Sequence, residues 1–376
     1  MKVLITATVQ SHICQFHKPL AEVLHAAGYE VHVAARDNLA KKNGLKLDFA
    51  DKVFDVPFSR SPKSTDNIKA YKQLKKIIDN GGYDIVSCNT PMGGIVTRLA
   101  AKKARKNGTK VFYTAHGFHF YKGAPKKNWL IFYSIEKFFA RYTDKLITIV
   151  NEDYELAKKK FKCPVYHIHG VGVNEDKYLS LTNEQVTEFK KMNQYDDRFL
   201  VLCTGELNAN KNQKTVVNAI SILKNKYPQI LLLLAGNGKN EEGLKQQILD
   251  LRLENNVQLL GYRTDLEYFT NACDLIVSAS FREGLPLNIM EAMLCGKAVV
   301  ASNNRGHREL VVQNETGFIV ESCDSSAFAQ KIEQLINDVA LRKSFGNFAR
   351  QKIDNYKVSN VKKELVSIYN INKLEN

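Results

Sequence analysis

The segment that decides the fold is SFREGLPLNIMEAMLCG, residues 280–296, which directly follows the apolar run 274–278. The apolar run predicts a buried strand, and Pro286 has the fixed φ angle that suits the first position of a helix. Glu283 and Glu291 therefore stand in the turn and in the helix that follow one strand. In doubly wound α/β domains this carboxyl end of a strand is where ligands bind.

Short apolar stretches alternate with helical patterns along the rest of the chain, which predicts βαβ units around parallel sheets. A polar stretch, 170–195, separates two such series. We predict two doubly wound Rossmann-like domains, 1–170 and 171–376, that face each other across a cleft. The last helical stretch is expected to pack against the second sheet, with packing on the first domain as the alternative. The expected strands are 3–8, 30–35, 52–56, 84–87, 110–115, 145–150 and 165–168, then 199–204, 230–235, 257–260, 274–278, 297–301 and 317–320.

Composition and charge narrow the class of protein. The chain has 376 residues, enough for two domains, and 44% of them are hydrophobic, which excludes general disorder. Seven scattered cysteines without a CxxC pair indicate a reducing compartment. Residues 1–170 hold 29 lysines and arginines against 14 aspartates and glutamates, so they carry the entire net charge of +15. This asymmetry predicts an anionic partner for the first half: nucleic acid, an acidic membrane surface or a phosphorylated substrate.

The two glutamates suggest recognition of sugar hydroxyl groups. Glu283, at the helix entrance, can accept hydrogen bonds from a sugar, and Glu291 can accept two from a vicinal diol such as a ribose. The free N–H groups of the helix start suit a phosphate. The alternative is that Glu283 is a charge favoured by the helix dipole and Glu291 a solvated surface residue.

This spacing resembles the E-x7-E motif of the retaining glycosyltransferases of family 4, which have the GT-B fold. The resemblance extends over nearly the whole chain and is greatest to the bacterial branch that builds capsular and exopolysaccharides. The matching segments are LAGNG (234–238), the family's glycine loop; GYRTDL (261–266), near the nucleotide base; RGHRE (305–309); TGFIV (316–320); and TAHGFHF (114–120), the histidine loop that faces the donor sugar.

The resemblance implies metal-independent, retaining transfer of a sugar from a nucleotide diphosphate sugar, expected to be a UDP-sugar, to a lipid-linked (polyprenyl diphosphate) glycan precursor. It implies neither a metal nor another cofactor, and it assigns the donor to the second domain and the acceptor to the first. The catalytic residues are then His116 and Glu283. The donor-binding residues are Gly205, Lys211, Gly236, Gly238, Arg263, Gly284, Leu285 and Glu291.

The phosphate-binding loop departs from the family pattern. Family members carry an arginine and a lysine here, and in the loop 203–213 Lys211 stands at the lysine position while Glu206 stands at the arginine position. A carboxylate would repel a diphosphate, so Glu206 must be neutralised by another cation or point away. Arg282, Arg305 and Arg308 are the candidates for the missing positive charge.

The first strand–helix loop, expected over 8–17, also lacks the glycines that many relatives have there. Ser11, His12 and His17 are expected on the acceptor side, together with Lys122. The alternative for His17 is packing in the first helix. For His116 the alternative is a structural histidine.

The segment YKGAPKKNWLIFY, 121–133, combines lysines with aromatic residues, as is typical of proteins that bind the interface of an anionic membrane. Burial in the core is the alternative for Phe132, Phe138 and Phe139. With no apolar run of about 20 residues, we expect a cytoplasmic protein that associates peripherally with the inner face of the cell membrane.

Other classes of protein lack their motifs in this sequence. There is no GxGxxG after the first strand, no P-loop and no acidic pair at a strand end for a catalytic metal. The non-enzymatic rival is a binder of an anionic polymer or nucleic acid through the basic half. The sequence contains no recognisable nucleic-acid-binding module, so no nucleic acid is expected as a partner.

Overall fold

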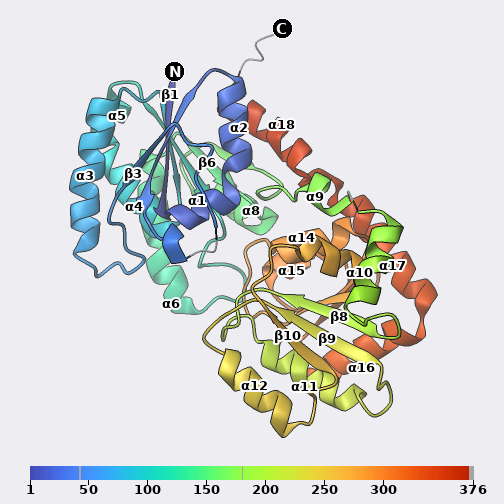
Figure 1. Ribbon diagram of the computed structural model, residues 1–376. Coiled ribbons are helices and arrows are strands. Elements are labelled where there is room, and N and C mark those ends of the chain that lie inside the picture. The colour runs from blue at the N-terminus through green and yellow to red at the C-terminus, as the bar shows by residue number, and fades with distance from the viewer. Residues whose placement is uncertain (42–43, 180, 372–376) are drawn as a thin grey trace. The chain divides into compact units, whose positions relative to one another are not determined.

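The computed structural model describes residues 1–41, 44–179 and 181–371, and the chain forms two compact units (Figure 1). Unit 1 comprises Met1–Gly172 together with the segment from Val358 onward, and unit 2 comprises Val173–Lys357. The units therefore do not coincide with the continuous ranges 1–170 and 171–376. The assignment of the acceptor and the donor to them stays a prediction.

Helix α18 (Val358–Tyr369) belongs to unit 1 through specific contacts. It lies beside α2 (Lys18–Ala26), as Figure 1 shows, and Lys362 Nζ lies 2.7 Å from Glu22 Oε2. The buried hydroxyl groups of Tyr369 and Ser87 are 2.7 Å apart. The last helix therefore packs on the first half of the chain, which was the alternative, and the expectation that it packs against the second sheet was wrong.

The described part of unit 1 contains a seven-stranded parallel sheet with the order β3-β2-β1-β4-β5-β6-β7. Buried apolar residues line its inner strands because helices cover both faces, whereas the edge strands β3 and β7 hold no buried residue. The strands are β1 (Lys2–Val9), β2 (Glu30–Arg36), β3 (Lys52–Asp55), β4 (Ile85–Asn89), β5 (Lys110–Ala115), β6 (Lys145–Thr148) and β7 (Val165–His167). The remaining helices are α1 (Gln10–Phe16), η1 (Leu39–Lys41), α3 (Asp66–Gly81), α4 (Pro91–Ala100), α5 (Lys102–Lys106), α6 (Lys126–Asn128), the π-helix η2 (Trp129–Tyr133), α7 (Ser134–Phe139), η3 (Ala140–Tyr142) and α8 (Asn151–Lys160).

The described part of unit 2 contains a six-stranded parallel sheet with the order β10-β9-β8-β11-β12-β13. Its strands are β8 (Phe199–Thr204), β9 (Ile230–Ala235), β10 (Val257–Gly261), β11 (Leu275–Ser278), β12 (Ala298–Ser302) and β13 (Gly317–Val320). Its helices are α9 (Glu175–Leu179), α10 (Asn183–Met192), α11 (Gln213–Leu223), α12 (Glu241–Asp250), α13 (Leu266–Ala272), α14 (Leu287–Leu294), α15 (Arg305–Leu310), α16 (Ser325–Asn337), α17 (Val339–Lys352) and η4 (Ile353–Tyr356).

Strand β8 shows how the core of unit 2 is built. Val201 and Cys203 pack into one hydrophobic cluster, and Leu200 and Leu202 pack into another. Since successive side chains of a strand point to opposite faces, these are the two faces of the sheet. Each cluster also contains helix residues, so the sheet is buried on both sides, as continuous apolar strands predict.

Two local predictions were wrong. Residues 8–17 were expected to form a loop, but β1 extends to Val9 and α1 begins at Gln10. Pro286 was expected at the first helical position, but it has ψ 116° and caps α14, whose first residue is Leu287. None of the described helices is both long and apolar enough to cross a lipid bilayer.

A buried ion pair connects helices α4 and α7 in unit 1. Arg98 Nη2 lies 2.9 Å from Glu136 Oε2, and both side chains are more than nine-tenths buried. Tyr113 donates its hydroxyl hydrogen to Glu136 at 3.1 Å, and the Arg98 guanidinium lies over the Tyr113 ring at 4.0 Å. Every charged group in this cluster has a partner, as burial of charge requires.

Removal of one partner tests this cluster. We expect Glu136→Ala to lower the free energy of unfolding by about 3–5 kcal/mol, because it leaves the Arg98 guanidinium buried and unpaired. Asp79→Ala breaks a surface pair with Lys75 four residues earlier on α3 and should cost less than about 1 kcal/mol. Urea denaturation of both variants measures the difference; equal losses would contradict the account.

Candidate active site

In unit 2 the loops after neighbouring strands approach so closely that only glycine fits at their contacts. A Cβ atom at Gly236, after β9, would lie 2.1 Å from the carbonyl oxygen of Gly205, after β8. A Cβ atom at Gly306, after β12, would lie 2.4 Å from the carbonyl oxygen of Gly284, after β11. Gly238 makes a third contact of this kind. Four loops thus meet at the carboxyl edge where the order of strands changes direction, the usual ligand position in such a sheet.

Lys211 and Glu283 form an ion pair at this edge. Lys211 Nζ lies 2.7 Å from Glu283 Oε1, and both side chains are largely buried. The stem of Lys211 passes over Gly205, where an added Cβ would lie 3.1 Å from Lys211 Cε. Two residues that the resemblance assigned to the donor phosphate and the donor sugar therefore lie together in space.

His307 is a residue of this region that the sequence did not single out. Its Nδ1 lies 2.8 Å from the Ser302 carbonyl oxygen and 2.9 Å from the Asn304 side-chain nitrogen. Nε2 is buried with no hydrogen-bond partner in the described part of the chain. Burial lowers the pKa of His307 to about 4, with opposing smaller effects from Glu283 and Lys211. A neutral imidazole thus lies near the Lys211–Glu283 ion pair. The sequence feature that could have pointed to His307 is its position in the segment RGHRE.

Glu291 lies on α14 in contact with a residue from α9. The Tyr178 hydroxyl donates a hydrogen bond to the Glu291 carboxylate. Burial raises the pKa of Glu291, and the hydrogen bond from Tyr178 opposes that rise. The sequence could not reveal Tyr178, because it precedes β8 and reaches the site only through the fold.

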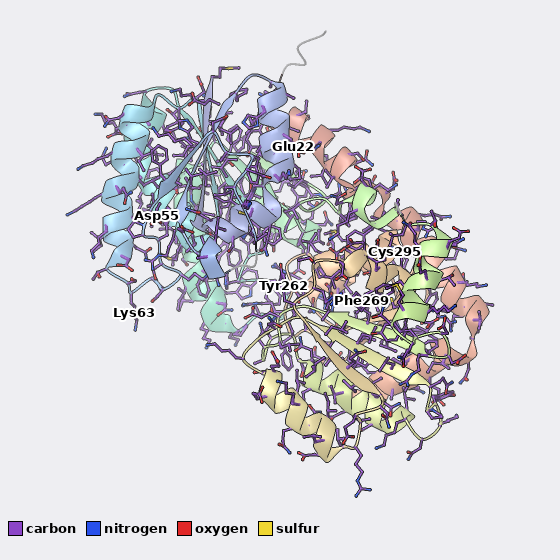
Figure 2. The ribbon with its side chains drawn as sticks, viewed as in Figure 1. Glu22, Asp55, Lys63, Tyr262, Phe269 and Cys295 are labelled. Atoms are coloured by element: carbon purple, nitrogen blue, oxygen red, sulfur yellow. The ribbon has the colours of Figure 1, made fainter. Side chains whose placement is uncertain are left out.

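The other predicted donor residues have different surroundings. Arg263 makes two hydrogen bonds to Asp265, of 2.8 and 2.5 Å, and lies over the Phe269 ring at 5.1 Å. Tyr262, labelled with Phe269 in Figure 2, is the exposed neighbour of Arg263 in this loop. Leu285 is half-buried and packs against the hydrophobic core. Arg263 is therefore already paired with a carboxylate.

The Glu206 side chain is exposed, and the expectation that it is neutralised by a cation or points away from an anion stays a prediction. Of the three arginines considered as replacements, Arg305 is buried and Arg282 is exposed. Arg308 Nη1 donates to Asn303 Oδ1 at 2.6 Å. The cation shown beside Glu283 is Lys211.

In unit 1 the fold brings together His12, His17 and His116. His12 lies on α1, His17 ends that helix, and His116 directly follows β5. The ring of His116 lies 4.5 Å from that of His12 and 5.3 Å from that of His17, measured between centroids. The predicted acceptor residues His12 and His17 thus lie against the predicted catalytic His116. His17 is also buried at the end of α1, so its side chain packs there, as the alternative for this residue expected.

The other predicted acceptor residues do not join this cluster directly. Ser11 is buried, and its backbone N–H and hydroxyl group bond to the Asn38 side chain at 3.0 and 2.8 Å. Lys122 is exposed, and its backbone N–H donates to Glu152 Oε1 at 2.7 Å. Ser11 therefore supports α1, whereas Lys122 presents a charge to solvent.

Burial keeps the three histidines neutral. It lowers the pKa of His116 to about 4 and the pKa values of His12 and His17 well below 6.5, and a charge on His116 would lower the latter two further. His116 Nε2 lies 3.4 Å from Asn89 Oδ1, a long contact. The cluster therefore offers imidazole nitrogen atoms without a net charge at neutral pH.

Comparisons with known proteins agree on one class of enzyme. A family model described as glycosyl transferases group 1 matches residues 184–352, and one described as glycosyl transferase 4-like matches 2–150. The chain is 40% identical over 371 residues to a putative glycosyltransferase, EpsD, of Bacillus subtilis, covering 98% of this chain and 96% of the relative. It is 29% identical, over 84% of each chain, to the Escherichia coli UDP-Gal:alpha-D-GlcNAc-diphosphoundecaprenol alpha-1,3-galactosyltransferase.

Solved structures share the fold. Anabaena HepE in complex with UDP superposes with a TM-score of 0.78 at 22% identity, over 98% of this chain and all of that one. WaaG, a glycosyltransferase involved in lipopolysaccharide biosynthesis, gives a TM-score of 0.75 at 16% identity, over 97% of this chain and 99% of its own. The GT-B fold and the resemblance to family 4 are confirmed, and the non-enzymatic rival is not favoured.

The pH dependence of stability tests the burial of the histidines. Because the pKa of His116 is about 4 in the folded protein and about 6.5 when unfolded, the unfolded chain binds the proton more strongly between these values. Stability should therefore fall as pH decreases from about 6.5 towards 4 and should change little from this group above pH 7. We expect His116→Asn to lose less stability than the wild type between pH 7 and pH 5, measured by urea midpoints. Identical pH slopes would contradict burial of a neutral His116.

Proposed function

The chain belongs to the glycosyltransferase family that the group 1 and 4-like models describe, and from this premise we propose how it acts. It transfers a sugar from a UDP-sugar to a hydroxyl group of a polyprenyl-diphosphate-linked glycan precursor, with retention of configuration and without a metal. The observation that carries this proposal is the 2.7 Å contact between Lys211 and Glu283 at the edge where the loops meet.

Unit 2 offers a suitable environment for the donor. Lys211 supplies positive charge to the leaving diphosphate, and Glu283 accepts hydrogen bonds from the transferred sugar. In the structure these two groups hold each other, so a bound phosphate and sugar would replace a contact that is already made. Glu291, positioned by Tyr178, accepts hydrogen bonds from the ribose hydroxyl groups.

The proposed chemistry is a displacement on one face of the sugar. The acceptor oxygen forms a bond to the anomeric carbon while the bond from that carbon to the phosphate oxygen breaks. The acceptor proton passes to the leaving phosphate. His116, kept neutral by burial, donates a hydrogen bond in the transition state.

The lipid-linked acceptor is supported by the relatives. The Escherichia coli relative is named for a diphosphoundecaprenol substrate. A relative in Staphylococcus aureus, CapM, 25% identical over 93% of this chain, is named for capsular polysaccharide biosynthesis. We propose the same substrate class and a role in capsule or exopolysaccharide synthesis for this chain.

Unit 1 carries a surface that suits an anionic membrane. The segment around η2 exposes large apolar side chains, with Leu130 76% exposed and Ile131 50%. Phe132 and Phe138 are also exposed, which argues against the alternative of core burial for these two. Lys126 and Lys127 precede the segment and are exposed. Basic and apolar groups side by side favour peripheral binding to the inner face of the cell membrane.

Two variants separate binding from catalysis. We expect Glu291→Ala to weaken UDP binding by about 1.5–3 kcal/mol, the value of a hydrogen bond to a charged group. Glu283→Ala should reduce turnover by roughly 100-fold while free UDP binds nearly as well, because its contacts are made with the sugar. Calorimetric titration with UDP and initial rates with the UDP-sugar distinguish the two. Unchanged UDP affinity in Glu291→Ala would remove its role as ribose anchor.

Charge reversal tests the membrane surface. Each lysine near an anionic bilayer contributes about 1 kcal/mol of attraction, so Lys126→Glu with Lys127→Glu should sharply reduce cosedimentation with phosphatidylglycerol-containing vesicles. The matched control is Lys191→Glu with Lys343→Glu, which reverses two exposed lysines of unit 2. Raising the salt concentration should weaken wild-type binding. Equal loss in both double variants would contradict the proposed orientation.

A further inference from the structure

The histidine cluster of unit 1 has the composition of a metal site. His12, His17 and His116 each offer one ring nitrogen, and these three atoms lie within 4.8 Å of one another. Two of the residues come from α1 and its end, and the third comes from the loop after β5. In tetrahedral zinc coordination neighbouring nitrogen ligands lie about 3.3 Å apart. Changes in the side-chain χ angles can bring the three nitrogen atoms from within 4.8 Å of one another to this shorter distance.

Two ring nitrogen atoms of this cluster are buried. The Nε2 atoms of His12 and His17 have no hydrogen-bond partner in the described part of the chain, and the His17 side chain is nineteen-twentieths buried. A neutral imidazole has one donor and one acceptor nitrogen, and a buried polar atom normally finds a partner. The two buried Nε2 atoms can therefore each bond to a ligand placed between the rings.

A transition-metal ion fits this requirement better than an anion or a proton. The three rings carry no charge of their own to bind an anion, although the charge of Arg60 acts on His12 and lowers its pKa. A proton on one ring would face two further rings at about 5 Å. Neutral imidazole is the preferred nitrogen ligand of zinc, and three histidines leave a fourth position open. His12 and His116 each keep a small part of their surface exposed to solvent.

We propose that His12, His17 and His116 bind one divalent transition-metal ion of the zinc class, and that its binding inhibits the enzyme. The inhibitory part rests on the proposed function, in which His116 donates to the reacting sugar. A metal ion bound to a ring nitrogen of His116 would prevent the imidazole from donating its hydrogen bond to the sugar. The reaction itself needs no metal, so the site acts as an inhibitory switch.

Zinc binding to the chelator-treated full chain tests the site directly. Competition with a chromophoric chelator should show one high-affinity ion per chain in the wild type. His17→Ala and His12→Ala should each weaken binding by about tenfold or more, since each removes one ligand. The matched control is His25→Ala, which removes an exposed histidine paired with Asp51 and should leave the affinity unchanged.

A measurement on the unaltered protein guards against misfolded variants. Co²⁺ added to the wild type should give the intense visible absorption of four-coordinate cobalt with nitrogen ligands, and Zn²⁺ should abolish it. Absence of that absorption, or wild-type zinc affinity in His17→Ala, would overturn the metal site.

The inhibitory part has a separate readout. Initial rates of sugar transfer should fall at least tenfold when the zinc site is saturated and recover when EDTA is added, whereas EDTA alone should not change the untreated rate. Zinc binding without loss of rate would overturn inhibition. Absence of sugar transfer under any condition would overturn the proposed function and the inhibition that rests on it, while the chelator and cobalt results would still decide the metal site.

Discussion

The site in unit 2 depends on the absence of side chains where its loops touch. Gly236 lies against the carbonyl group of Gly205, and Gly306 lies against that of Gly284, at distances that a Cβ atom cannot occupy. This packing of backbone on backbone lets four loops meet at one edge of the sheet. As a result Lys211, from the loop after β8, reaches Glu283, from the loop after β11. A methyl group at Gly236 or Gly306 would push the loops apart and separate the charges that the proposed chemistry needs.

Much of the fold could be predicted because its strands are short, apolar and separated by helical patterns. Strands β5, β8, β9 and β13 match their expected ranges, and the other strands lie within a few residues of theirs. The errors occurred where local signals are weak. Helix α1 has no side-chain cap and no acidic residue in its first turn, so nothing marked its start at Gln10. Tertiary packing, which brings His12 and His17 against His116, gives this short helix its place.

The resemblance predicted several residues of the candidate site, but it did not predict the contacts between their side chains. The resemblance supplied Lys211, Glu283 and Glu291 as separate positions, but the ion pair joins residues 72 positions apart and follows only from the order of strands. Tyr178 lies in no motif, and His307 was quoted only as part of the segment RGHRE. Tyr178 matters because it donates a hydrogen bond to the Glu291 carboxylate, and His307 matters because it lies near the Lys211–Glu283 ion pair. Sequence reasoning finds residues that a reaction requires more readily than residues that hold them in position.

If the chain transfers a sugar with retention of configuration, the new glycosidic bond has the anomeric configuration of the donor. The purified protein is incubated with UDP-sugars whose anomeric carbon is in the α configuration and with an undecaprenyl-diphosphate-linked sugar. Proton NMR then gives the coupling constant of the new anomeric proton. The account predicts an α-linked product. A β-linked product, or no transfer from any UDP-sugar, would contradict it.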